Sequence, residues 1–343
     1  MAPASGNSEP EALIADFAGF YKSEVQQKPG ERFKYDFGCF IGGLRGCLTY
    51  FCLPPCSPVC RTTFKNMMKQ QPRVPVKIYN AREKQAQEGL STREFFERYG
   101  FVLVEHHTKM TSEDWLANTS IAGVERSSLI EDSKSALRQI YAKELEPLIR
   151  ELLPKSGQIF YPKVALRRGP GGPNPHYGLG VHQDFGLYPE DLRLYSYKLG
   201  GDFGSFEEFK SRLAEQGTAG VCMLNFWRPV LPMKGPVKDT PLALCDPNTV
   251  NVEDTVNTEL HGFVSGGMAS MGLKFNADQK WYYYSDVTTK EVIVFRQFIY
   301  SRDVDAPYKQ LRTVFHSAFR HPNASKDDEP RCSSEYRLGV WLT

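Results

Sequence analysis

Net charge is almost absent from this chain of 343 residues, in which 42 Lys and Arg face 40 Asp and Glu. That balance gives no electrostatic basis for binding nucleic acid or an anionic membrane surface. The opening "MAPASGNSEPEALIADF" lacks the basic start and apolar core of a secretory signal, so we expect a cytoplasmic protein. Internal repeats and low-complexity tracts are missing as well, and nothing in the sequence indicates an oligomeric state. The length allows one large domain or two modest ones.

Paired Cys-x-x-Cys motifs are also missing, although five of the eight cysteines crowd into one stretch: Cys39, Cys47, Cys52, Cys56 and Cys60. Structural zinc sites usually repeat such pairs, and disulfides need an oxidising compartment that nothing here indicates. The segment 37–60 has Arg45 as its only charge, which allows membrane contact, but glycines and prolines make it a poor transmembrane helix. We therefore expect an irregular, cysteine-rich extension over 1–73 that packs against a folded domain over 74–343. We also expect residues 1–70 to be dispensable for metal binding.

The folded domain begins with helix signals and continues with strand signals. The stretch "STREFFERYG" has Ser91 or Thr92 as N-cap and Gly100 as stop, and residues 127–153 have helical periodicity with Pro147 as a kink or break. From "IFYPKVALRR" onward, strand-like runs are separated by Gly, Pro, Asn and Asp. This order predicts an α+β protein with a double-stranded β-helix (jelly-roll, cupin-like) core and flanking helices.

Histidine is scarce, and one of the seven lies in "VHQDF". In a strand, residues two apart point to the same face, so His182 and Asp184 would aim a nitrogen and a carboxylate oxygen at one point. That is two thirds of the 2-His-1-carboxylate site of non-haem Fe(II) enzymes. The third ligand is predicted to be His316, in the late strand-like run "TVFHSAF". A lone histidine is more often structural or solvated, and we interpret the other five in that way.

A second constellation follows His316 in "PRCSSEYRLGVWL". In an extended chain Arg331, Ser333 and Arg337 share one face, together with Glu335. An Arg with a Ser two residues on could hold a carboxylate, here the distal carboxylate of 2-oxoglutarate. Arg331 is the first choice for this role and Arg337 the second. The alternative is an exposed strand on which Glu335 pairs with an Arg.

The chain resembles the hydroxylase/desaturase family named for aspergillic-acid biosynthesis, which has relatives in cephamycin- and gibberellin-type pathways. The matching stretches, in order, are "VHQDF", "NFWRPVLPMKGPVKDTPLALCD", "KWYYYSDVTTKEVIVFRQF", "VFHSAF" and "PRCSSEYRLGVWL". The likeness runs from about residue 74 to the end and does not include the cysteine cluster. That family resembles the Fe(II)/2-oxoglutarate oxygenases, and its HxD…H positions fall on His182, Asp184 and His316.

Further residues are candidates for contacts with substrate or co-substrate. Trp227 could line a pocket or simply fill the core, and one tyrosine of "WYYY" could reach 2-oxoglutarate. The two arginines before the Gly/Pro loop could meet an acidic substrate group. The candidates are Tyr282 for the co-substrate and Arg167, Arg168, Asn225, Trp227 and Arg228 for the substrate.

These residues predict an Fe(II)/2-oxoglutarate-dependent oxygenase that uses O₂ to hydroxylate or desaturate a small molecule. Two alternatives stay open. One is a metal-dependent oxidase, with iron or copper, that does not use 2-oxoglutarate. The other is a non-catalytic jelly-roll binding module, which would keep the fold without an open metal site.

Overall fold

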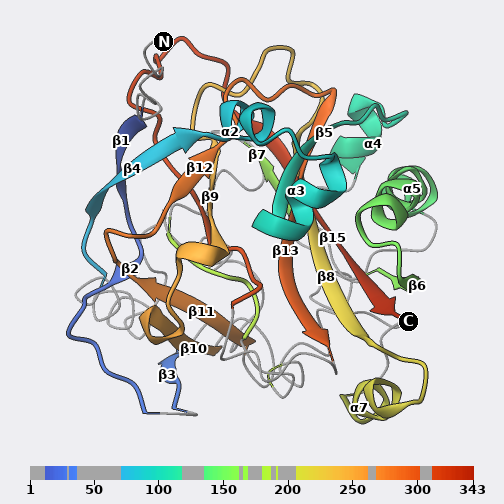
Figure 1. Cartoon of the computed structure of the whole chain (residues 1–343). Coiled ribbons are helices and arrows are strands. Elements are labelled where there is room, and N and C mark those ends of the chain that lie inside the picture. The colour runs from blue at the N-terminus through green and yellow to red at the C-terminus, as the bar shows by residue number, and fades with distance from the viewer. Residues whose placement is uncertain are drawn as a thin grey trace, which may run out of the picture.

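The structure is a computed structural model, and it describes residues 12–28, 31–36, 71–117, 135–161, 165–168, 180–186, 191, 206–261, 268–301 and 311–343. Three β-sheets form its framework, and helices lie beside the largest of them (Figure 1). The cysteine cluster between Cys39 and Cys60 lies outside the described residues. None of the described helices is long and apolar enough to cross a membrane.

The large sheet forms one wall of the barrel, and its three central strands are its longest, with 10 or 11 residues each. These strands are β13, β8 and β15, and β15 also pairs with the short β7. In sheet order the strands are β5 (Phe101–Glu105), β13 (Glu291–Ser301), β8 (Gly220–Pro229), β15 (Cys332–Leu342) and β6 (Ser156–Phe160), with β7 (Ala165–Arg168) beside β15.

Two smaller sheets make the other wall of the barrel, called here the second wall. The first has the order β1 (Ala12–Phe17), β4 (Val74–Asn80), β12 (Trp281–Tyr283), β9 (Leu242–Cys245) and β14 (His316–Ala318). The second has the order β2 (Phe20–Tyr21), β11 (Met268–Lys274), β10 (Thr255–His261) and β3 (Phe33–Asp36). Residues 180–183, called here the connecting segment, join the two, because His182 pairs with His316 of β14 and Gln183 pairs with Met271 of β11. The strands thus enclose a barrel of the jelly-roll kind.

Five α-helices are described: α2 (Ala81–Glu88), α3 (Thr92–Tyr99), α4 (Ser112–Ala117), α5 (Ala142–Leu152) and α7 (Phe206–Ala214). Short helical turns lie at Leu137–Tyr141, Pro247–Thr249 and Val252–Asp254. As predicted, Ser91 caps α3 in a capping box with Glu94, and Gly100 ends it in a left-handed conformation. Pro147 does not break α5, whose apolar face packs on the large sheet and continues past the proline.

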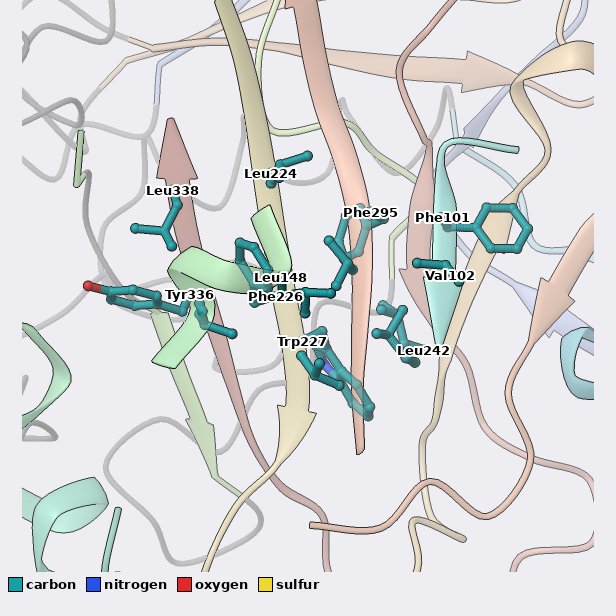
Figure 2. Packing of buried hydrophobic residues seen from close by; sticks show 14 of the residues in the cluster. Phe101, Val102, Leu148, Leu224, Phe226, Trp227, Leu242, Phe295, Tyr336 and Leu338 are labelled. Carbon is teal, nitrogen blue, oxygen red and sulfur yellow. The ribbon is translucent and has the colours of Figure 1, made fainter. Parts of the chain in front are cut away.

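The main core lies between the large sheet and these helices. Phe226 of β8 and Leu338 of β15 point to this side, where they meet Leu148 of α5 (Figure 2). The next residues along the same strands point into the barrel because side chains alternate between the two faces of a strand. The helices therefore leave the other face of the sheet for a site.

The N-terminal strands differ from the prediction of an irregular extension. Phe17 of β1 and Phe20 of β2 are buried, and their rings lie 5.0 and 5.8 Å from that of Trp281 in β12. Between them, Gly19 has φ +89°, and a Cβ there would lie 2.4 Å from the backbone nitrogen of Val181 in the connecting segment. This close approach requires glycine. Residues 12–21 are therefore part of the second wall and not of an irregular extension. That residues 1–70 are dispensable for metal binding stays a prediction, and this packing argues against it for residues 12–21.

Candidate metal centre

The two candidate histidine ligands are tied together by their own backbones. His182 and His316 exchange both N–H···O bonds, at 3.1 and 3.0 Å, as a hydrogen-bonded antiparallel pair does. Their imidazole rings consequently lie on the same face, with centroids 4.5 Å apart. Asp184 follows two residues after His182 and completes the set.

The three side chains form a compact donor set. The Nε2 atom of His182 lies 3.6 Å from Oδ1 of Asp184, and Nε2 of His316 lies 3.9 Å from Oδ2. All candidate ligand atoms lie within 4.8 Å of one another, and no other group of three or more metal-ligating residues occurs among the residues that the structure describes. Two imidazoles and one carboxylate suit a divalent transition metal with open positions.

Hydrogen bonds prepare both rings to bind a metal, and burial adds to this for His316. The Nδ1 atoms of His182 and His316 lie 2.6 and 3.2 Å from the backbone carbonyls of Gly180 and Val314, which leaves each Nε2 as the acceptor atom. Burial, reinforced by the neighbouring His182, lowers the pKa of His316 to about 4. The His316 ring is therefore neutral near pH 7, as a metal ligand must be.

Asp184 is oriented from the large sheet. Gln297 of β13 donates from Nε2 to its Oδ2 at 2.8 Å, and Nη2 of Arg337 on β15 lies 2.6 Å from the same oxygen. Arg337 also lies 3.5 Å from a carboxylate oxygen of Glu335. These contacts fix the carboxylate and balance the charge of Arg337 with two carboxylates.

Gln297 was not predicted as a site residue, although the sequence contains a signal for it. The adjacent polar residues Arg296 and Gln297 break the alternation of an apolar strand, and the structure has a β-bulge between Arg296 and Phe298. The carbonyl of Gln297 accepts hydrogen bonds from the side chains of Gln183 and Thr313. The bulge thus turns Gln297 toward Asp184 and anchors it there.

Two of the residues predicted to hold 2-oxoglutarate lie at the start of β15, the strand that carries Arg337: Ser333 is on this strand and Arg331 immediately precedes it. Arg331 is 1% exposed, donates from Nη1 to the carbonyl of Thr240, and places its guanidinium carbon 5.6 Å from the centroid of the Trp227 ring. Ser333 is fully buried, and its hydroxyl has no hydrogen-bond partner among the described residues. An Arg beside an unsatisfied hydroxyl can accept a carboxylate.

Two further predicted residues face the barrel interior from β8. Asn225 lies opposite Arg337 of β15 and Phe295 of β13, and Trp227 lies opposite Glu335. Both amide atoms of Asn225 and the indole nitrogen of Trp227 are buried without a partner in the described part of the chain. A buried polar group left unsatisfied costs about 1–3 kcal/mol, so a polar ligand would be stabilised on this face.

Arg228 does not reach this face. Alternation along β8 turns it to the helix side, where it is fully buried and contacts the Nδ1 and carbonyl oxygen of His106 at 3.2 and 3.1 Å. It also donates to the carbonyl of Thr289. The structure therefore does not bring Arg228 together with Trp227, and it gives Arg228 a role in joining the sheet to its outer layer.

Tyr282 lies on the same sheet as His316, with Leu244 of β9 paired between them. Its ring packs 5.8 Å from that of Tyr79 and 6.0 Å from that of Phe101, and burial raises the pKa of its hydroxyl to about 12. These contacts place Tyr282 in the core, with no described contact to the three candidate ligands.

Arg167 and Arg168 lie on β7, where their backbones pair with Ser333 and Cys332. Their side chains are outside what the structure describes. The backbone pairing nevertheless brings these two positions beside the start of β15.

The fold is shared with solved metal-dependent enzymes. Two structures titled as an iron and alpha-ketoglutarate-dependent endoperoxidase NvfI align with TM-scores of 0.63 and 0.62, at 17% identity. The alignments cover 98% and 96% of this chain and 99% and 98% of those chains. The predicted jelly-roll core with flanking helices is thereby confirmed.

Sequence comparison gives the family. Residues 54–341 match the model of the family described as an Oxidoreductase/YMDC permease-like domain, and the chain belongs to this family. The match covers most of the chain, and it begins within the expected N-terminal extension.

Two curated relatives have shorter matches. The Fe(II)/2-oxoglutarate-dependent dioxygenase nvfI of Aspergillus novofumigatus is 33% identical over 118 residues, which are 34% of this chain. Aspirochlorine biosynthesis protein N of Aspergillus oryzae is 29% identical over 121 residues, which are 35% of this chain. These matches span 39% and 47% of the lengths of the two relatives. The predicted resemblance to Fe(II)/2-oxoglutarate oxygenases agrees with the name of the first.

Proposed function

We propose that this protein is an Fe(II)/2-oxoglutarate-dependent oxygenase that hydroxylates or desaturates a small organic molecule. The observation that carries the proposal is the His182, Asp184 and His316 set, whose ligand atoms lie within 4.8 Å of one another. The name of the nvfI relative and the fold of the NvfI structures support it. An open metal site with oxidoreductase relatives favours an enzyme over a binding module.

In this proposal His182, Asp184 and His316 would hold the metal. The backbone carbonyls of Gly180 and Val314 hold the imidazoles with Nε2 facing inward, and Gln297 holds the carboxylate of Asp184. Iron bound there would supply O₂ activation coupled to oxidation of 2-oxoglutarate. The chain would orient the substrate beside the metal.

Arg331 is proposed to bind the distal carboxylate of 2-oxoglutarate, with Ser333 as a hydrogen-bond donor. Arg337 is the second choice because its charge is already balanced by Asp184 and Glu335. Asn225 and Trp227 would satisfy their buried amide and indole groups against the bound ligands. Their strand, β8, faces the same interior as Arg337.

The substrate is proposed to be a small molecule of specialised metabolism. The name of the relative from Aspergillus oryzae, a protein of aspirochlorine biosynthesis, supports this class. The family that the sequence resembles includes both hydroxylases and desaturases, so both reactions are kept in the proposal. A cytoplasmic location remains a prediction from the sequence.

The test is metal content combined with 2-oxoglutarate turnover. The purified chain should bind about one Fe(II) and release succinate only when Fe(II) and 2-oxoglutarate are both present. His316→Ala should lose both properties because it deletes one of three ligand bonds. His321→Ala serves as the control: its ring lies near Tyr283, 3.4 Å from the tyrosine oxygen, and it should keep both properties. Full iron occupancy in His316→Ala would contradict the proposed site. Oxidation of a substrate without 2-oxoglutarate and without release of succinate would favour the oxidase alternative.

A further inference from the structure

A cavity of about 40 Å³ lies on the connecting segment, between His182 and one face of the sheet that contains β10 and β11. Its described lining consists of Gly19, Tyr21, Tyr35, Gln71, Gly180, Val181, His182, Thr258, Leu260, Ser270, Met271 and Gly272. A candidate metal ligand is therefore also a wall of this cavity. None of the roles assigned above to Arg331, Ser333 or Arg337 involves it.

Most polar groups around the cavity already have partners. Ser270 donates its hydroxyl to the carbonyl of Gln183 at 2.7 Å, and Thr258 donates to the carbonyl of Ser270 at 3.0 Å. The hydroxyls of Tyr21 and Tyr35 are hydrogen-bonded to each other at 3.2 Å. These side chains give the cavity a fixed polar wall.

Gln71 is the exception in this lining. It is 7% exposed, and its Oε1 is buried without a hydrogen-bond partner in the described part of the chain. Leaving a buried amide oxygen unsatisfied is costly, whereas an N–H or O–H group in the cavity would remove that cost. The cavity therefore favours a guest that donates a hydrogen bond.

The absence of charged side chains from the described lining further restricts the kind of group that the cavity can bind. The described lining contains no Asp, Glu, Lys or Arg. Burial raises the pKa of Tyr35, so its phenol stays neutral at physiological pH. A carboxylate such as 2-oxoglutarate would meet no cation here, and burying an unpaired charge is strongly unfavourable. The volume exceeds the roughly 10–15 Å³ that one water needs, which suits a small group and not a ring.

We propose that this cavity binds a small, uncharged hydroxyl or amide group of the organic substrate and that Gln71 is its recognition residue. Because His182 is a common wall, a substrate anchored there by one polar end would place its remaining part beside the metal. The assignment of this group to the substrate rests on the proposed oxygenase function. The binding of such a group by the cavity does not depend on that function.

The probes are acetamide, acetone and acetate, which have similar size and differ in donor capacity and charge. Saturation-transfer NMR on the full chain should detect acetamide, with weaker signals from acetone and acetate. Gln71→Met keeps the size of the side chain and should weaken acetamide binding roughly two- to tenfold, the range of one hydrogen bond. Gln279→Met is the matched control, because Gln279 is also a buried glutamine whose Oε1 has no partner among the described residues, but it does not line this cavity.

A second measurement tests the link to the metal. With Mn(II) bound to the wild type, the relaxation of acetamide protons should be enhanced, and Gln71→Met should reduce that enhancement. Equal acetamide binding in wild type and Gln71→Met, or acetate binding as strong as acetamide, would overturn the recognition role. Acetamide binding that depends on Gln71 but shows no enhancement would overturn the link to the substrate. If the chain binds no metal, saturation transfer still decides the cavity, and the oxygenase proposal fails separately.

Discussion

The two walls of the barrel are built differently. The large sheet has central strands of 10 or 11 residues that pair along most of their lengths. The other wall consists of two sheets of strands that are 2 to 7 residues long, which residues 180–183 join by isolated backbone pairs. The three candidate ligands come from the second wall. Residues that orient Asp184, or are proposed to hold the co-substrate, come from the first.

This difference separates two tasks. The candidate ligands lie on short paired segments, so their positions depend on the packing of the strands around those segments. The long strands of the large sheet should tolerate an altered side chain, because their backbone pairing remains. Changes in the second wall should therefore affect stability, and changes on the inner face of the large sheet should affect affinity.

The largest effect is expected from Phe20→Ala. Phe20 is fully buried against Trp281 and Phe275, and such a truncation typically costs about 3–5 kcal/mol of unfolding free energy. Chemical denaturation measures the loss. Ile14→Ala, on the neighbouring strand, is the control, because Ile14 is 61% exposed and should change stability by less than about 0.5 kcal/mol. Equal stability of the two variants would mean that the N-terminal strands do not support the second wall.

A change on the large sheet should act on the co-substrate instead. Arg331→Ala should raise the KM for 2-oxoglutarate about ten- to a hundredfold while iron stays bound, because it removes one charge-assisted pair. Succinate release at varied 2-oxoglutarate measures this. Arg337→Ala is compared in parallel and should alter metal binding through Asp184. If only Arg337→Ala raises the KM, the carboxylate cradle lies at Arg337.

Gln297→Leu tests whether the large sheet orients the ligands of the other wall. Loss of the hydrogen bond to Asp184 should weaken Fe(II) binding about tenfold, the lower end of the range for groups that orient metal ligands. Metal titration with Mn(II) or Fe(II) gives the dissociation constants. Gln279→Leu, a buried glutamine remote from Asp184 in its described contacts, should leave metal affinity unchanged. Unchanged affinity in Gln297→Leu would remove the proposed coupling between the walls.

The smallest effect concerns pH. The pKa of His316 is lowered from 6.5 to about 4 in the folded chain, so below pH 6.5 the unfolded chain takes up a proton that the folded chain does not. The contribution of neutral His316 to the stability of the metal-free chain is therefore fully present above that pH and is lost progressively as pH falls toward 4. Between about pH 7.5 and about pH 5.5 the loss should be about 1 kcal/mol. Urea denaturation measures it, with His316→Asn as the variant that should lose this dependence.

The sequence predicts the parts of the site that rest on short-range patterns. The spacing of His182 and Asp184 predicts their common side, and "FHSAF" indicates a strand that carries His316 as the third candidate. The structure brings these three side chains together. Ser91 and Gly100 mark the ends of their helix by local hydrogen bonding and by backbone conformation. Each of these signals lies within a few residues.

What the sequence does not predict depends on contacts between distant segments. The turn at Gly19 approaches Val181 closely, and no sequence pattern near either residue predicts this contact. Gln297 reaches Asp184 only because a bulge shifts the register of β13 against β8. Arg228 was placed by its neighbours in sequence, but strand alternation turned it to the other face. Such features are set by the packing of whole sheets.

The double backbone hydrogen bond between His182 and His316 has a consequence for metal exchange. If the proposed site binds a metal, two ligands whose backbones are fixed by strand pairing should stay in position when the ion leaves, so the site would not have to reassemble before the next ion binds. Rebinding should then be fast for any divalent ion that two imidazoles and one carboxylate can hold. Selection of iron over its competitors would have to come from supply in the cell and from the chemistry that follows binding.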